Sequence, residues 1–255
     1  MPHDVFTDAF LDAMGAWQRG WKEQKNRRLE LTDALLRAIG EASLPPSATT
    51  ADEVCYRKRY LYKDNPENGG DHVPIFIGRG YDEGVASWST EFEWLKAFKG
   101  EIKIDATATI FAHKPEPGEV ILNIKRLWQI EGFAEAVKDY RKRGGAEADA
   151  LLNIRDKQSE VILRAPLLID EIEAFCGPTG DYNQLFAEAG IDCEQQKDAF
   201  VNRLKEINRF PGDPYWLPRD AAQRVVGRTV EKFWQRVESL RSQRLPLTQS
   251  DDNKA

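Results

Sequence analysis

Long apolar segments are missing from this 255-residue sequence. No stretch approaches the ~18 uninterrupted apolar residues that a membrane-spanning helix needs. The N-terminus also lacks the basic segment and the following apolar run of a secretion signal. We therefore expect a cytoplasmic protein that has no membrane partner.

Cysteine and net positive charge are also lacking. Cys55, Cys176 and Cys193 are odd in number, widely spaced and not accompanied by paired histidines, which argues against a disulfide framework and against a zinc site. We expect reduced cysteines in the core and no bound metal. The formal charge of −6 excludes a global attraction to nucleic acid or anionic membranes, although it leaves room for a local basic face.

The sequence does contain enough apolar residues for one main domain, because 41% of its 255 residues are hydrophobic. Apolar residues recur at helical spacings of three and four towards both ends of the chain. Pattern and composition together predict four parts: an N-terminal helical region (1–45), a core (51–164), a C-terminal helical region (165–242) and a disordered tail (243–255).

Between the two helical regions, short β-prone runs predict the strands of the core. Residues 54–61 would place Arg57 and Arg59 on one face of a strand, although an edge strand with arginines facing water is an equally good interpretation. Residues 85–90 form a hydroxyl-rich strand end that leads into a helix with Thr90 as its N-cap. The other β-prone runs are 73–77, followed by a glycine-rich turn, and 106–112 and 119–124, which we expect a tight turn to join.

Segment 158–163 is the best candidate for a strand with a functional role. Residues two apart in a strand point to the same face, so Gln158 and Glu160 would project together. In a helix, the same spacing turns the two side chains away from each other. Three other pairs of residues have the same spacing, but the sequence in or after each of them is helix-like, which disfavours them. They are Gln129/Glu131, Glu91/Glu93 and Glu171/Glu173.

Three short motifs follow one another in order over residues 54–163. They are an arginine on an early strand, Ser-x-Ser/Thr at a strand-to-helix junction, and Gln-x-Glu at the start of a late strand. This order resembles the R-S-E group of mono-ADP-ribosyltransferases. The resemblance implies an α+β fold with an ADP-ribosyltransferase-like split β-sheet core and helical regions at both ends. The 73 positions from Ser87 to Glu160 exceed the usual spacing in the family, which keeps Gln129/Glu131 as an alternative pair.

The resemblance also implies residue roles in a reaction with NAD. Glu160 would stabilise the oxocarbenium-like charge that develops on the ribose when its bond to nicotinamide breaks. Ser87 would orient this carboxylate and keep it ionised, and Ser89 would support the same turn. The guanidinium of Arg57 would bind the NAD phosphates, with Arg59 as the weaker match. The remaining NAD-binding residues would be Tyr56 and Trp88.

Gln158 bears on the acceptor of the ADP-ribose. Relatives with glutamate at this position typically modify arginine, whereas an uncharged amide suits a protein amide or a nucleobase. We therefore expect a macromolecular acceptor other than arginine and, by analogy with the family, an intracellular toxin or phage-defence effector with a possible antitoxin protein. Two alternatives stay open: an NAD glycohydrolase with water as acceptor, and a non-catalytic module whose helices bind a partner.

The last predicted helix carries one basic stripe, because cationic residues recur there every four positions. A solvated face explains such a stripe better than a contact with phosphates does. If the acceptor is a nucleic acid, however, the stripe is the best candidate for binding it. Its residues are Arg224, Arg228, Lys232 and Arg236.

Overall fold

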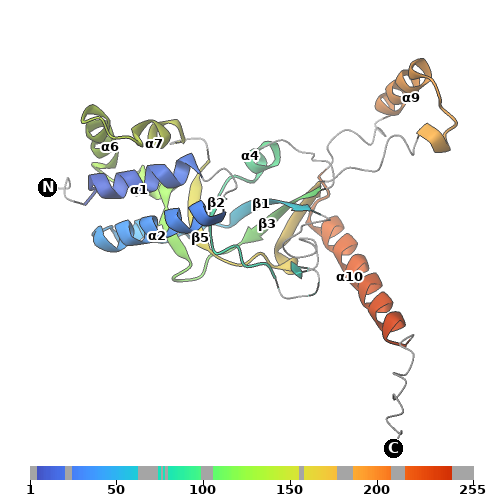
Figure 1. Ribbon diagram of the computed structural model, residues 1–255, viewed down its shortest axis with the longest axis horizontal. Coiled ribbons are helices and arrows are strands. Elements are labelled where there is room, and N and C mark those ends of the chain that lie inside the picture. Colours follow the sequence, from blue (N-terminus) through green and yellow to red (C-terminus); the bar gives the residue numbers. More distant parts are fainter. Residues whose placement is uncertain are drawn as a thin grey trace, which may run out of the picture.

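One antiparallel sheet organises the part of the chain that the computed structural model describes. The described residues are 5–20, 25–62, 74, 75, 77, 80–98, 106–154, 158–176, 186–207 and 216–242. Helices pack against the sheet (Figure 1), so the fold belongs to the α+β class that the sequence predicts. The predicted run 73–77 lies partly, and the predicted tail 243–255 wholly, outside the described residues.

Six strands of the described residues follow the order β4-β5-β2-β1-β3-β6, and all neighbours are antiparallel. β3 pairs with β1 along the whole of β1, whereas β1 and β2, as described, share one paired position, Tyr56 with Ser89. The sheet therefore has two three-stranded halves that meet at this position. The strands are β1 (Cys55–Tyr62), β2 (Val85–Ser89), β3 (Ala106–His113), β4 (Val120–Asn123), β5 (Glu160–Arg164) and β6 (Ile172–Cys176).

Most of the helices gather around the half of the sheet that contains β4, β5 and β2 (Figure 1). Six of them share an apolar core with these strands: α1 (Asp8–Arg19), α2 (Lys25–Glu41), η1 (Pro46–Thr49), α5 (Ile124–Leu127), α6 (Phe133–Lys142) and α7 (Ala148–Ile154). The others among the described residues are α4 (Phe92–Ala97), η2 (Ile169–Glu171), α9 (Glu194–Glu206) and α10 (Arg219–Ser242).

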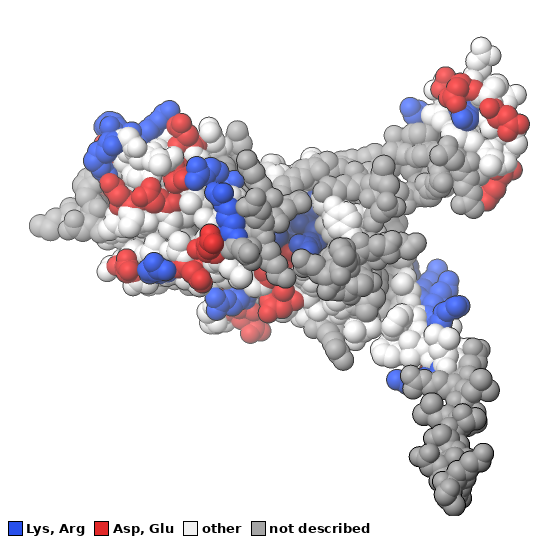
Figure 2. All heavy atoms as spheres, viewed as in Figure 1, with Lys and Arg blue, Asp and Glu red and all other residues white. Residues whose placement is uncertain are grey.

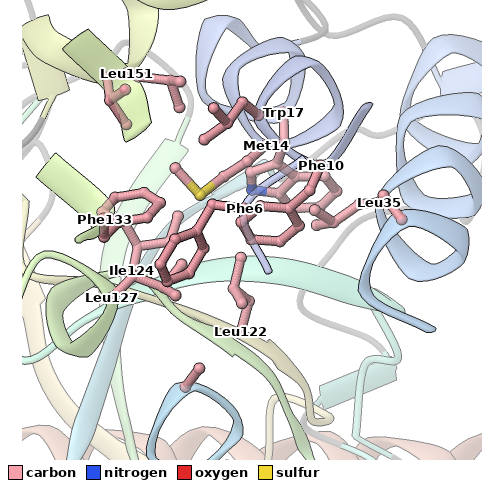
Figure 3. Close-up of a cluster of buried hydrophobic side chains, with 14 of the residues drawn as sticks. Phe6, Phe10, Met14, Trp17, Leu35, Leu122, Ile124, Leu127, Phe133 and Leu151 are labelled. Carbon is pink, nitrogen blue, oxygen red and sulfur yellow. The ribbon is translucent and has the colours of Figure 1, made fainter. Parts of the chain in front are cut away.

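The N-terminal helix α1 is amphipathic and buries its apolar face against the sheet. Thr7 caps the start of the helix, because its side chain accepts a hydrogen bond from the Phe10 N–H at 3.2 Å. Phe10, Met14 and Trp17 are buried in one cluster with Leu122 of β4 (Figure 3), and Ile162 of β5 belongs to the same cluster. Burial of each such side chain stabilises the fold by roughly 1.5–3 kcal/mol. The predicted N-terminal helical region is therefore part of the main core.

The predicted strands over 106–112 and 119–124 exist as β3 and β4, but they do not form a hairpin. β3 pairs with β1 and β6, while β4 pairs with β5 in the other half of the sheet. His113 Nε2 at the end of β3 lies 2.8 Å from Glu119 Oε2 just before β4, so the chain stays together here while the strands diverge. The position of β4 depends on its pairing with the buried strand β5. The turn residues between β3 and β4 predict a turn, but they do not predict which strand β4 pairs with.

The predicted C-terminal helical region contains a strand. Apolar spacing over residues 168–175 suggested a helix, but β6 forms here and pairs with β3, so Glu173 lies in a strand. Four of the five residues of β6 are buried, and burial on both faces removes the alternation that marks a strand in sequence. The sheet therefore continues beyond residue 164, and the helices α9 and α10 follow it, as predicted.

Two local predictions also need correction. Thr90 is not the N-cap of α4, because the helix begins at Phe92 after Glu91, and Ser89 Oγ accepts the Glu91 N–H at 3.0 Å. The cysteines are free, and two of them are buried, but Cys193 is exposed at the start of α9 and is not a core residue.

His113 lies between two carboxylates at the point where β3 and β4 diverge. Its Nδ1 lies 2.6 Å from Glu171 Oε1, and its Nε2 contacts Glu119. The hydrogen bond with Glu171, aided by Glu119, outweighs burial and raises the pKa of His113 to about 9. The protonated histidine therefore stabilises the folded state fully below its unfolded pKa of ~6.5, and this contribution is lost as the pH rises through 9.

We expect the substitution His113→Gln to lower the free energy of unfolding on the order of 2 kcal/mol at pH 6 and by much less at pH 10. Urea unfolding of both proteins at the two pH values measures this difference. Lys142→Gln, which breaks an exposed pair with Asp139, is the matched control and should cost less than about 0.5 kcal/mol at either pH. An equal loss for His113→Gln at both pH values would contradict the charged state of His113.

Candidate active site

Glu160 opens β5 and lies under the C-terminal end of α1. It pairs with Ser89 across the β2–β5 ladder, and only 5% of the residue is exposed. Trp17 Nε1 donates to Glu160 Oε1 at 3.3 Å, and Gln18 Nε2 donates to Oε2 at 3.2 Å. Consecutive residues of α1 thus bind both carboxylate oxygens.

Ser87 lies on the same sheet face as Glu160, since residues two apart on β2 point to the same side. Trp17 Nε1 is 3.0 Å from Ser87 Oγ, so one indole N–H is shared between the hydroxyl and the carboxylate. The rest of the indole ring is packed in the apolar cluster of α1 (Figure 3), which fixes the position of this donor. Trp17 therefore connects the predicted serine with the predicted catalytic glutamate.

The environment of Glu160 changes its pKa. Burial is the largest influence and raises the pKa above the ordinary glutamate value. Hydrogen bonds from Ser87, Gln18 and Trp17, together with the charge of Arg57, act in the opposite direction and favour the ionised form. Carboxyl groups with a pKa shifted by burial and by specific polar partners concentrate at functional sites.

Arg57 links β1 to the backbone of β2 where the two halves of the sheet separate. Its Nη1 donates to the Ser87 carbonyl oxygen at 2.8 Å, and its Nε donates to Glu83 Oε2 at 2.8 Å. Arg59 donates through Nη1 to Glu83 Oε1 at 2.7 Å. The prediction that both arginines share one face of β1 is confirmed, and Arg57 is the one that contacts Ser87.

Glu83 lies buried at the centre of three guanidinium groups. Arg28 of α2 joins the group, because its Nη2 donates to the carbonyl oxygens of Glu83 and Val85, the second at 2.7 Å. Burial raises the pKa of Glu83, but the charges of Arg57, Arg59 and Arg28 outweigh it and lower the pKa to about 2. The cluster connects α2, β1 and β2, and three positive charges around one carboxylate leave a net positive charge beside Ser87.

Gln158 lies just outside β5, so the alternation argument for Gln158 and Glu160 does not apply. Ser159 between them has a φ of +42°, in the left-handed region that non-glycine residues seldom adopt. Ser89 Oγ donates to the Gln158 carbonyl oxygen at 2.6 Å, and the Thr90 N–H donates to the Ser159 carbonyl oxygen at 3.2 Å. The end of β2 therefore holds the turn that carries Gln158.

The structure brings Tyr56, but not Trp88, to the face of Glu160. Tyr56 pairs with Ser89 and packs on Phe92, with ring centroids 5.2 Å apart. Trp88 points to the other face, where it is buried in a separate cluster with its ring centroid 5.7 Å from that of His113. Trp88 is thus a core residue rather than a neighbour of the candidate carboxylate.

The alternative pair Gln129/Glu131 lies in a different setting. Both side chains are exposed in the turns between α5 and α6. Glu160, in contrast, is buried next to the predicted serine. The burial of Glu160 and its hydrogen bonds therefore favour it over Glu131 as the candidate catalytic carboxylate.

Four residues of this site are not predicted by the sequence patterns. Trp17 fits the apolar spacing of the predicted N-terminal helical region, which indicates only a core residue, and no motif marks Gln18, Arg28 or Glu83. Trp17 and Gln18 lie more than 140 positions from Glu160 in the sequence. Glu83 lies in a glycine-rich segment that predicts a turn. A Trp-Gln pair at the end of an amphipathic helix carries no local signal for such contacts.

The described residues contain no cluster of histidine, cysteine, aspartate and glutamate that could hold a metal ion. Among the same residues, no helix has the length and apolar character needed to cross a membrane. Comparisons of the chain with protein-family models, with curated proteins and with solved structures find no match.

Proposed function

We propose that the protein is a mono-ADP-ribosyltransferase that uses NAD at the site around Glu160. The observation that carries the proposal is the convergence of Arg57, Ser87 and Glu160. These residues come from three consecutive strands of the sheet, β1, β2 and β5, and they meet around Ser87. The join of the two sheet halves at one position, next to these residues, also supports an ADP-ribosyltransferase-like split sheet.

The polar groups present suit the reaction. Cleavage of the bond between ribose C1 and nicotinamide builds positive charge on the ribose, and the ionised Glu160 carboxylate stabilises this charge. The acceptor nucleophile then bonds to C1 and loses its proton, while nicotinamide leaves. Arg57 and the net positive charge around Glu83 attract the NAD diphosphate, although Arg57 already binds Glu83 and the Ser87 carbonyl.

Access to Glu160 requires a movement of α1. Trp17 and Gln18 bind both carboxylate oxygens, and the residue is nearly fully covered. A ribose therefore reaches the carboxylate when the C-terminal end of α1 shifts away from β5. In the covered state neither the ribose of NAD nor water contacts the carboxylate, so cleavage of NAD waits for the movement of α1.

The turn before β5 supports an acceptor other than arginine. Gln158 is held next to Glu160 by the hydrogen bond between Ser89 and its backbone carbonyl. An amide side chain both donates and accepts hydrogen bonds, which suits a protein amide or a nucleobase but does not neutralise a guanidinium. We therefore propose a macromolecular acceptor and, as the biological setting, a toxin or phage-defence effector that acts inside a cell.

Incubation of the full chain with NAD labelled on the adenylate part, in the presence of total cell lysate, tests the proposal. Label that becomes bound to macromolecules supports transfer, and its release by protease or by nuclease identifies the class of acceptor. Release of free labelled ADP-ribose without any bound label would show a glycohydrolase instead. A protein that neither cleaves nor binds NAD would contradict the proposal and favour the non-catalytic module.

The variant Gln158→Ala separates the acceptor step from cleavage of NAD. We expect transfer to the macromolecule to fall by about 10-fold or more, because the amide that holds the acceptor is lost, while slow hydrolysis of NAD continues. Both rates are measured in the same labelled reaction. Gln129→Ala, in the exposed turn after α5, is the matched control and should leave both rates unchanged. A parallel loss of transfer and hydrolysis in Gln158→Ala would contradict the role in the acceptor step.

A further inference from the structure

The last helix, α10, carries an apolar seam that extends beyond the core. Its first turns pack on the sheet, where Ala222 and Val226 are buried. The rest of the helix projects away from the other elements (Figure 1). Along this part, Phe233 and Leu240 are 39% and 56% exposed. Large apolar side chains left open in a row indicate a surface that a partner covers.

The spacing of the seam is that of a coiled coil. Its residues follow one another at intervals of four, three, four and three, which places them at successive a and d positions of a heptad repeat. The core covers the start of the seam, because Val226 is buried and Val230 is packed against the same cluster. The later positions continue the same line without a cover from the described residues. The seam consists of Val226, Val230, Phe233, Val237 and Leu240.

Two positions at the edges of the projecting part of the seam are basic. Arg236 falls at a g position and Arg241 at an e position, where charged side chains contact a partner helix. Arg241 pairs with Glu238 of its own helix, while Arg236 has no carboxylate partner among the described residues. Figure 2 shows blue, cationic side chains on the projecting helix. A partner with carboxylates beside an apolar seam complements this surface.

We propose that the projecting part of α10 docks an acidic amphipathic helix of a different protein. Two copies of α10 are a poor match, because the helix has six arginines and lysines against three acidic residues, and a parallel pair would set Arg236 against Arg241. An anionic membrane or a nucleic acid is also a poor match. The chain as a whole carries a formal charge of −6, which disfavours both of these polyanionic partners. This inference does not depend on the proposed function.

The test uses the full chain and two synthetic helical peptides of three heptads, both with leucine at a and d. One peptide has glutamate at e and g, and the other has lysine there. Titration calorimetry should give at least 10-fold tighter binding of the glutamate peptide. Equal binding of both peptides would overturn the proposal, as would dimerisation of the chain alone in analytical ultracentrifugation. Preferential binding to phosphatidylserine vesicles or to a DNA duplex would also overturn it.

Variants on the helix surface complete the test, because exposed positions can change without loss of the fold. Phe233→Ser combined with Leu240→Ser should weaken binding of the glutamate peptide at least 10-fold, with an unchanged midpoint of thermal unfolding. Leu29→Ser, at an exposed leucine of α2, is the matched control and should have no effect. Arg236→Glu should lower the ratio of the affinities for the glutamate and lysine peptides more than Arg228→Glu does, because Arg228 lies on the side of the helix away from the seam. An equal effect of the two charge reversals would overturn the proposed use of the seam.

Discussion

Replacement of Glu160 by glutamine should lower both ADP-ribose transfer and NAD cleavage on the order of 10³-fold, which corresponds to about 4 kcal/mol of transition-state stabilisation. The amide keeps the size of the side chain but cannot oppose the positive charge on the ribose. The amide oxygen can still accept a hydrogen bond from Trp17 or Gln18, so we expect the fold to persist. Rates with labelled NAD and the midpoint of thermal unfolding, measured on the same preparation, separate these two effects.

Glu131→Gln is the matched control for this substitution. Glu131 is exposed in the turn after α5 and belongs to the alternative pair, so its replacement should leave the rate within about twofold of that of the unchanged protein. A well-folded Glu131→Gln that is inactive, beside an active Glu160→Gln, would move the active site to the other pair.

The pH dependence of the rate provides a second check on Glu160. The reaction needs the ionised carboxylate, and burial raises the pKa of this group. The value of kcat/KM reports the free protein, in which α1 covers Glu160, so it should increase with pH above the ordinary glutamate pKa of ~4.3 rather than below it. Gln18→Leu removes a hydrogen bond that favours the ionised form, so it should move this limb to still higher pH. A limb at or below pH ~4.3 would show that another group controls the reaction.

The sequence predicted the local parts of this site better than their connections. The strand with Arg57, the strand end with Ser87 and the strand with Glu160 were all found from β-prone runs, because each pattern is contained within a few residues. The runs 106–112 and 119–124 were found as β3 and β4, but the strands they pair with were not, since pairing partners depend on contacts far apart in the sequence. β6 was missed because a strand buried on both faces has no alternation to detect.

The contacts of α1 with the site were outside the reach of sequence patterns. An apolar period predicts that Trp17 faces a core, but it does not predict which polar groups meet the indole N–H. The positive φ of Ser159 is another example, because nothing in Gln-Ser-Glu signals a left-handed residue before the strand. Only the packing of α1 on β2 and β5 brings Trp17 to Ser87 and Glu160.

Loss of the Glu83 carboxylate should have the largest effect on stability. Glu83→Gln leaves Arg28, Arg57 and Arg59 close together without their buried counter-charge. Removal of one partner from a buried ion cluster typically costs about 3–5 kcal/mol, because the remaining charges stay desolvated and repel one another. For a chain of this size, such a loss lowers the midpoint of thermal unfolding by on the order of 10 °C. Urea unfolding at pH 7 measures the change in free energy.

Glu93→Gln is the matched control, since it removes a carboxylate whose pair with Lys96 is exposed. We expect it to cost less than about 0.5 kcal/mol. Equal stabilities of the two variants would contradict the buried cluster around Glu83.

The acid limb of stability tests the same cluster without depending on a folded variant. The arginines lower the pKa of Glu83 to about 2 against the effect of burial. A lowered pKa stabilises the folded state above the unfolded glutamate value of ~4.3, and the contribution is lost as the pH falls from there through 2. Urea unfolding of the unchanged protein between pH 5 and pH 2 should therefore show a steep loss of stability. If Glu83→Gln folds, its loss over the same range should be smaller, and an equal loss would mean that other carboxylates account for the acid limb. Because Arg57 bonds to both Glu83 and the Ser87 carbonyl, weakening of this cluster should also loosen the strand junction next to Glu160.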